Sequence, residues 1–104
     1  MTYKLFLDDV RNPPDNSWIL ARSYEDAVRL VNTHGIPNTV SFDHDLGDNV
    51  PTGKDFANFL IDLDLDSNIM PKDFTFFVHS ANPCGAENIR GVLESYINFK
   101  NTQE

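Results

Sequence analysis

The run FTFFVH at residues 74–79 limits the fold more than any other stretch, because it is almost wholly apolar. Apolar residues at helical spacing precede this run and follow it. Before it come Phe56, Phe59, Leu60 and Leu63; after it come Ala86, Ile89, Leu93, Tyr96 and Ile97. A short strand that is apolar on both faces and lies between two helices indicates a parallel sheet that helices cover.

Three earlier runs also read as strands, at residues 3–7, 18–22 and 38–42. Ser23 and Thr52 each stand three residues before an aspartate, which is typical of a helix start. Asn82 followed by Pro83 predicts a third helix start, and Gly35 predicts the end of the first helix. The link between the first two strands is short for a parallel crossover, so the sequence leaves their pairing open.

The chain has 104 residues, enough for one core and too few for two. We therefore expect residues 1–104 to form a single α/β domain. Its sheet should have four strands, be mainly parallel and be flanked by helices.

Polar residues follow three of the expected strands, where each strand ends. In open parallel sheets, ligands bind beyond the carboxyl ends of the strands. The residues that this rule brings together are Asp8, Asp9 and Arg11 after the first strand, Asp43, His44 and Asp45 after the third, and His79, Ser80 and Asn82 after the fourth.

The four aspartates of this set predict a metal site. Two carboxylates about 4 Å apart repel by roughly 4 kcal/mol at an effective dielectric constant of ~20. Protonation, a basic neighbour or a cation must relieve that repulsion. Oxygen ligands from Asp8, Asp9, Asp43 and Asp45 suit Mg²⁺, and added imidazoles would also allow Mn²⁺. The alternative is that some of these acids only cap helices or face water.

His44 and His79 are the candidates for proton transfer. Two histidines across a phosphodiester would suit hydrolysis, one activating water and the other protonating the leaving oxygen. Arg11, Ser80 and Asn82, with the N-terminus of the last helix, are the candidates for phosphate binding. The alternatives are that the histidines are structural and that Asn82 only caps its helix. His34, just before Gly35, is expected to be structural at a helix C-terminus.

Two other patterns imitate functional motifs. Cys84 and Arg90 have the C-x5-R spacing of cysteine phosphatases, but the cysteine stands several residues beyond its strand. Residues 62–68, DLDLDSN, imitate a calcium loop but lack its glycine and its final glutamate. We expect a solvated acidic helix end there instead.

The charge balance limits the partners. A formal net charge of −8 and a pI near 4.6 argue against an extended nucleic-acid surface. They leave room for one phosphate held through a metal ion. No apolar run approaches transmembrane length, and with one cysteine the chain cannot form an internal disulfide. We therefore expect a cytoplasmic protein without a membrane partner.

The acidic pair Asp8-Asp9, the aspartate Asp43 and the Ser80-Ala81 pair resemble the receiver domains of response regulators. That resemblance implies a flavodoxin-like fold, an Mg²⁺ site at Asp8, Asp9 and Asp43, and a phosphoryl acceptor at Asp43. Ser80 would be the switch hydroxyl. The chain departs from the pattern by lacking the fifth strand with its lysine, so the expected fold is a truncated receiver.

The chain resembles the cyclic-phosphate processing receiver domains more closely. The resemblance rests on LFLDDxR-x-P-P, on SFDHDLG with the later TG, and on HSANPxG, and it spans residues 5 to about 93. It implies binding and hydrolysis of a small cyclic phosphate, such as an RNA 2′,3′-cyclic end or a cyclic nucleotide. The expected activity is that of a phosphoesterase. A signalling module phosphorylated on Asp43 and a non-catalytic ligand-binding or adaptor domain remain the alternatives.

Overall fold

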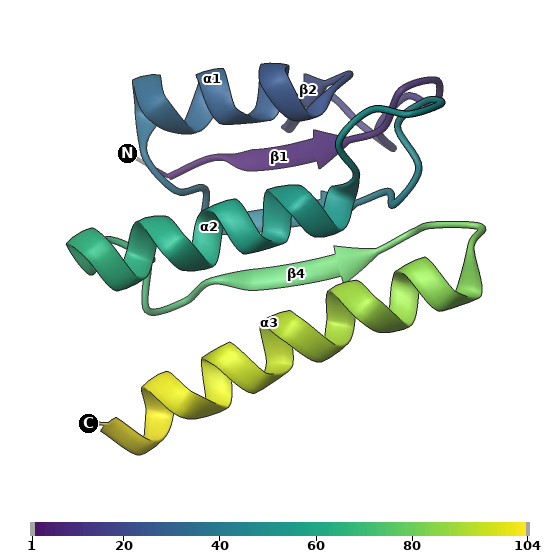
Figure 1. The fold of residues 1–104 in the computed structure, drawn as a ribbon. Coiled ribbons are helices and arrows are strands. Elements are labelled where there is room, and N and C mark those ends of the chain that lie inside the picture. Colours follow the sequence, from purple (N-terminus) through teal and green to yellow (C-terminus); the bar gives the residue numbers. More distant parts are fainter. Residues whose placement is uncertain (1, 104) are drawn as a thin grey trace.

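A computed structural model describes residues 2–103 of the chain. The chain begins with two strands, and from there on helices and strands alternate, which gives four strands and three helices (Figure 1). In chain order the elements are β1 (Lys4–Leu7), β2 (Trp18–Ala21), α1 (Tyr24–His34), β3 (Thr39–Phe42), α2 (Gly53–Ser67), β4 (Thr75–Val78) and α3 (Pro83–Gln103). The predicted α/β alternation is confirmed.

The four strands form one sheet in the order β2-β1-β3-β4, and every neighbouring pair is parallel. Leu5 of β1 lies opposite Ile19 of β2 and Val40 of β3. The pairing of the first two strands, which the sequence left open, is therefore parallel. Residues 8–17 make this crossover without a helix.

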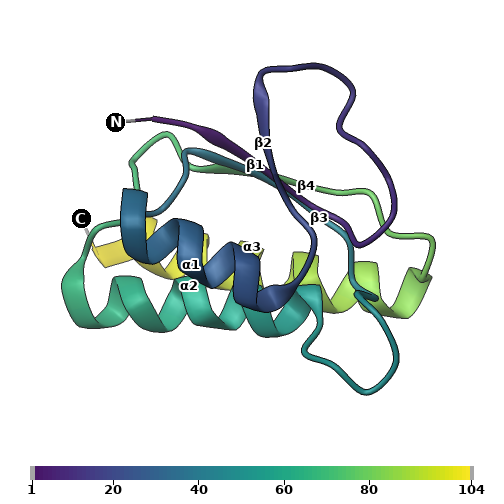
Figure 2. The ribbon, with the colours of Figure 1, turned by 90° about the horizontal axis from the view of Figure 1, so that it is seen from above.

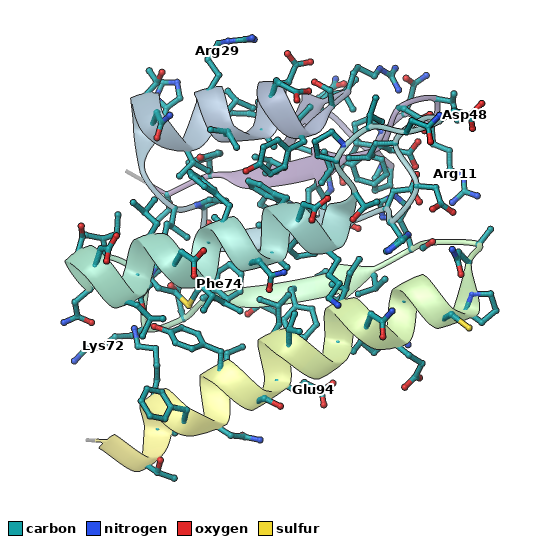
Figure 3. The ribbon with its side chains drawn as sticks, viewed as in Figure 1. Arg11, Arg29, Asp48, Lys72, Phe74 and Glu94 are labelled. Carbon is teal, nitrogen blue, oxygen red and sulfur yellow. The ribbon has the colours of Figure 1, made fainter. Side chains whose placement is uncertain are left out.

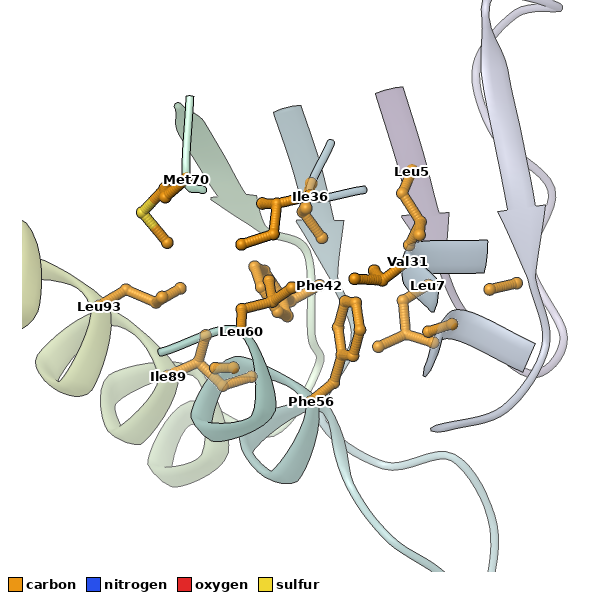
Figure 4. Close-up of a cluster of buried hydrophobic side chains, with 14 of the residues drawn as sticks. Leu5, Leu7, Val31, Ile36, Phe42, Phe56, Leu60, Met70, Ile89 and Leu93 are labelled. Carbon is orange, nitrogen blue, oxygen red and sulfur yellow. The ribbon is translucent and has the colours of Figure 1, made fainter. Parts of the chain in front are cut away.

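All three helices lie on the same face of the sheet (Figure 2). Side chains from alternate strand positions on that face and from each helix form a single buried cluster (Figure 4). Its fully buried members include Leu5, Leu7, Val40, Phe42, Phe56, Leu60, Ile89 and Leu93. The expected cover of helices is thus present on one face only.

The segment of residues 8–17 stands on the face opposite the helices (Figure 2). It contains Pro13 and Pro14, and proline in a helix interior would remove a hydrogen bond and clash with the preceding turn. Arg22 holds the segment in place, because its guanidinium donates to the Arg11 carbonyl at 2.7 Å and to Asn12 Oδ1 at 2.8 Å.

The predicted helix starts and stops are confirmed. Ser23 Oγ accepts from the Asp26 amide, and Thr52 and Asp55 form a complete capping box. Gly35 follows α1 with φ of 87°, a conformation that glycine adopts without strain. No helix in residues 2–103 combines the length and the apolar character that a bilayer crossing requires.

The expectation that residues 62–68 form a solvated helix end is wrong for Asp64. This residue lies on the face of α2 that packs against α3, and only 2% of its surface is exposed. Its carboxylate accepts hydrogen bonds from the Met70 amide at 2.7 Å, Tyr96 Oη at 2.5 Å and Lys100 Nζ at 2.6 Å. Because α2 continues to Ser67, most of the segment is helical rather than an open calcium loop.

The C-x5-R pair lies within one helix. Cys84 is the second residue of α3 and is exposed, whereas Arg90 lies further along the same helix. The Arg90 guanidinium pairs with Glu87 at 3.5 Å, one turn back. The two residues therefore do not form the loop that a cysteine phosphatase needs.

Candidate functional site

Three of the predicted acids meet at the carboxyl end of the sheet. Asp8, Asp9 and Asp43 each offer one carboxylate oxygen, and these oxygens lie within 4.8 Å of one another. The parallel ladder continues past the strand ends and brings them together, since the Asp43 amide donates to the Leu7 carbonyl at 2.9 Å. Arg11 lies at this end of the sheet and Lys72 at the other (Figure 3).

Asp8 is fully buried, and hydrogen bonds hold both of its carboxylate oxygens. Its Oδ1 accepts from the amides of Val10 at 2.9 Å and Arg11 at 2.8 Å, and its Oδ2 meets His79 Nε2 at 2.9 Å. Burial alone would raise the pKa of Asp8. The hydrogen bonds outweigh burial, so this pKa lies below its ordinary value and the carboxyl stays ionised.

The pKa of Asp43 is shifted in the opposite direction, upward. Burial raises the pKa of this carboxyl, and the negative charge of Asp8 raises it further, while the His44 amide and His79 offset only part of the effect. Among residues 2–103, no lysine or arginine side chain forms an ion pair with this cluster. The three carboxylates thus form an all-oxygen donor set whose repulsion is relieved only in part, and this set fits a metal cation.

His79 is held between two hydrogen-bond partners. Its Nε2 meets Asp8, its Nδ1 meets Ser41 Oγ at 2.8 Å, and its ring stacks on Phe6 at 4.5 Å between centroids. Because Asp8 is ionised, the hydrogen on Nε2 points to Asp8. The sequence reasoning missed Ser41, although it stands two residues before Asp43, and residues two apart in an extended chain point to the same face.

His44 has a different environment, built by Asp45 and Asn82. His44 Nδ1 lies 2.9 Å from Asp45 Oδ1, and Asn82 Nδ2 donates to Asp45 Oδ2 at 3.2 Å. These hydrogen bonds lower the pKa of Asp45, and the bond from His44 has the largest effect. No hydrogen bond to His44 Nε2 is found in the described chain. Asp45 thus differs from the other acids: it holds a histidine and is not one of the three clustered carboxylates.

Two glycines of the sequence motifs allow the close packing of this region. A Cβ at Gly85 would stand 2.3 Å from Cγ of His44, so only glycine lets α3 approach the imidazole. A Cβ at Gly53 would stand 1.8 Å from the Asp43 carbonyl oxygen. The Gly53 amide also donates to the His44 carbonyl at 2.8 Å. The glycines of "TG" and "HSANPxG" thus fix the backbone and the ring of the DHD segment.

The three phosphate-binding candidates lie at the same edge. Arg11 is exposed, and its Nη1 donates to the His79 carbonyl at 2.9 Å. A guanidinium has five N–H donors, so others remain for a ligand. Ser80 Oγ accepts from the Asn82 amide at 3.0 Å. Asn82 Oδ1 accepts from the Gly85 amide at 3.0 Å, so Asn82 caps α3 as expected.

The comparisons with known proteins agree with this geometry. A solved fusion chain, described as yeast Spc42 trimeric coiled-coil amino acids 181–211 fused to another structure, has a similar fold. The match has a TM-score of 0.57 and 16% sequence identity, and it covers 98% of this chain and 83% of that chain. At this identity the likeness shows the α/β receiver-like fold alone. None of the curated proteins compared with the chain matches it.

A family model described as "Cyclic-phosphate processing Receiver domain" matches residues 3–95. This range includes all four strands and the residues of the carboxyl edge from Asp8 to Asn82. The acidic cluster of Asp8, Asp9 and Asp43 is also typical of a receiver site. The chain therefore belongs to the family of cyclic-phosphate processing receiver domains.

Proposed function

We propose that this protein binds a small cyclic phosphate at the carboxyl edge of its sheet and hydrolyses it. The substrate class is an RNA 2′,3′-cyclic end or a cyclic nucleotide, and the enzyme class is a phosphoesterase. One observation carries the proposal: the cluster of three carboxylates stands at the strand end where His44 directly follows Asp43, and a fourth carboxylate, that of Asp45, orients this histidine. Family membership supports the choice of a cyclic phosphate.

Asp8, Asp9 and Asp43 are the residues that would hold a divalent metal, Mg²⁺ or Mn²⁺. Such an ion would neutralise phosphate charge and relieve the repulsion that raises the pKa of Asp43. We assign Asp45, predicted as a fourth ligand, to the orientation of His44, because it pairs with this histidine and is not one of the three clustered carboxylates.

His44 is the proposed general base. Asp45 fixes Nδ1, which leaves Nε2 to accept a proton from water. The water oxygen forms a bond to phosphorus, and one of the two ester P–O bonds of the ring breaks. The leaving sugar oxygen takes up a proton, so the product is a phosphate monoester.

His79 is the proposed source of the proton for the leaving oxygen. The proton it would donate is the one on Nε2, so His79 would exchange its hydrogen bond to Asp8 for one to the leaving oxygen in that step. Arg11 would bind a phosphate oxygen through the guanidinium donors that do not reach the His79 carbonyl. Ser80 and Asn82, with the N-terminus of α3, would line the same anion site.

The test is incubation with nucleoside 2′,3′-cyclic phosphates, with and without Mg²⁺ or Mn²⁺, followed by phosphorus NMR. We expect a metal-dependent monoester product that is lost in His44→Ala and in Asp43→Asn. His34→Ala is the matched control, because His34 lies at the C-terminal end of α1, away from the cluster. Absence of product with every metal would refute the proposed phosphoesterase activity. Binding of the cyclic phosphate without turnover would indicate an adaptor.

The position of Asp43 favours a second candidate, a signalling module phosphorylated on this residue. Asp43 lies in the acidic cluster, as the phosphoryl acceptor of a receiver does. The described residues form no fifth strand, and no lysine among them pairs with the cluster. Labelling by acetyl phosphate that disappears in Asp43→Asn, without turnover of cyclic phosphates, would decide for this candidate.

A further inference from the structure

The sheet face opposite the helices is covered unevenly. Over β1 and β2 stands the segment of residues 8–17 (Figure 2), and there Phe6 is only 7% exposed, in contact with Trp18 and His79. Over β3 and β4 no helix of residues 2–103 lies on this face. Phe77 in β4 is 56% exposed, a high value for a phenylalanine in a strand.

The register places Phe77 directly beside the candidate site. Phe77 lies opposite Ser41, whose hydroxyl bonds His79, whereas Phe76 and Val78 pack into the core on the other face. Residues two apart along a strand share a face and are about 6.6 Å apart. Phe77 of β4 thus stands two residues before His79, and Ser41 of β3 stands two residues before Asp43.

This part of the sheet carries no charge in an acidic protein. Its outward strand residues are Thr39, Ser41, Thr75 and Phe77, although the chain has 16 acidic residues and a net charge of −8. An uncharged aromatic surface that borders an acidic, metal-fitting edge complements a ligand with two parts. One part is a phosphate. The other is a planar uncharged ring that lies no further from the phosphate than the length of one nucleoside.

We propose that Phe77 stacks against the base of a nucleoside 2′,3′-cyclic phosphate whose phosphate lies at the carboxyl edge. This inference rests on the proposed function and adds to it the residue that would contact the base of the nucleotide. Every base has a π-face, so stacking on one phenylalanine selects for the presence of a base and tolerates its identity.

The experiment compares two ligands that differ only in the base: cytidine 2′,3′-cyclic phosphate and the base-free methyl riboside 2,3-cyclic phosphate. Affinity is measured by NMR titration of the full chain with Mg²⁺ present, and turnover is followed in the same samples. We expect wild type to bind the nucleotide roughly 5- to 100-fold more tightly. Phe77→Ala should remove this preference and Phe77→Trp should keep it.

Phe99→Ala is the matched control, because Phe99 is a similarly exposed phenylalanine, at 50%, in α3. It should leave the preference unchanged. Equal affinity of wild type for both ligands, or a preference that survives Phe77→Ala, would overturn the inference while turnover still supported the proposed function.

Three further outcomes bear on the inference and on the proposed function. A nucleotide preference that Phe77→Ala removes, without turnover of either ligand, supports the stacking surface and rejects the hydrolytic reaction. Sedimentation velocity identifies the other occupant of this face: a dimer that Phe77→Ala dissociates, with ligand preference unchanged, overturns the inference in favour of an interface between two copies. Failure of both ligands to bind overturns both proposals.

Discussion

Asp8 and Asp64 are both almost completely buried, at opposite ends of the molecule, and their surroundings differ in one respect. Asp64 has its own cation: Lys100 Nζ lies 2.6 Å away, and Tyr96 and the Met70 amide complete its hydrogen bonds. Asp8 is hydrogen-bonded as well, but its neighbours Asp9 and Asp43 add negative charge.

The difference separates a structural carboxylate from a candidate ligand. Hydrogen bonds and Lys100 lower the pKa of Asp64 against the effect of burial, so its charge stabilises the α2–α3 contact. At the carboxyl edge no lysine or arginine among the described residues balances the negative charges of the clustered aspartates. Burial and the charge of Asp8 therefore raise the pKa of Asp43. Repulsion that the fold leaves unrelieved is what a bound cation would relieve.

The largest expected effect is at the structural end. Asp64→Asn removes the charge that Lys100 and Tyr96 share, and we expect the free energy of unfolding to fall by about 3 kcal/mol. Urea unfolding measures this change. Asp62→Asn, an exposed acid on the same helix, is the control and should change stability by less than about 0.5 kcal/mol. Equal effects of the two substitutions would remove the contrast on which the comparison rests.

Metal addition tests the other end. If the three carboxylates bind Mg²⁺ or Mn²⁺, metal at 100 times Kd should stabilise wild type by about 2.7 kcal/mol. Thermal unfolding with increasing metal concentration shows this as a rise in Tm. Asp43→Asn should lose the shift and Asp62→Asn should retain it. A shift that persists in Asp43→Asn would place the metal elsewhere.

Without metal, the same substitution should stabilise the protein. A raised pKa means that ionised Asp43 costs folding free energy at pH 7, and Asp43→Asn should raise the free energy of unfolding by removing this cost. The cost exists above the folded-state pKa and disappears as pH falls through it and Asp43 becomes protonated. Wild type and Asp43→Asn should therefore converge in urea unfolding at low pH, and a variant that is less stable at pH 7 would contradict the repulsion.

The smallest effect concerns the ring of His44. The methyl group that Gly91→Ala adds to α3 would have no atom within 4 Å, so this substitution should stabilise the helix by roughly 0.5–1 kcal/mol. Gly85→Ala places a methyl group 2.3 Å from Cγ of His44, so it should gain no stability and should displace the ring from Asp45. Imidazole NMR shifts report the displacement. If both variants gain equally, the ring is not held by this contact.

Much of the edge followed from the sequence, because parallel strands end together wherever they occur. Asp8, Asp43 and His79 stand directly after strands whose apolar runs are visible, and pairing through the backbone then aligns their ends. The different roles of Asp45 and Ser41 did not follow, because which oxygen reaches which imidazole depends on side-chain directions. Asp64 was missed for a related reason, since its partner Lys100 is 36 residues away.

The strands, the helix caps, a mainly parallel sheet and the family can all be read from the chain alone, because these depend on local periodicity and on short motifs. Only the tertiary structure decided that all three helices cover one face, that His44 and His79 have different partners, and that Phe77 stays exposed beside the site. The physical reason is that burial and hydrogen bonding between distant segments depend on how the layers pack. No periodicity along the chain records that packing.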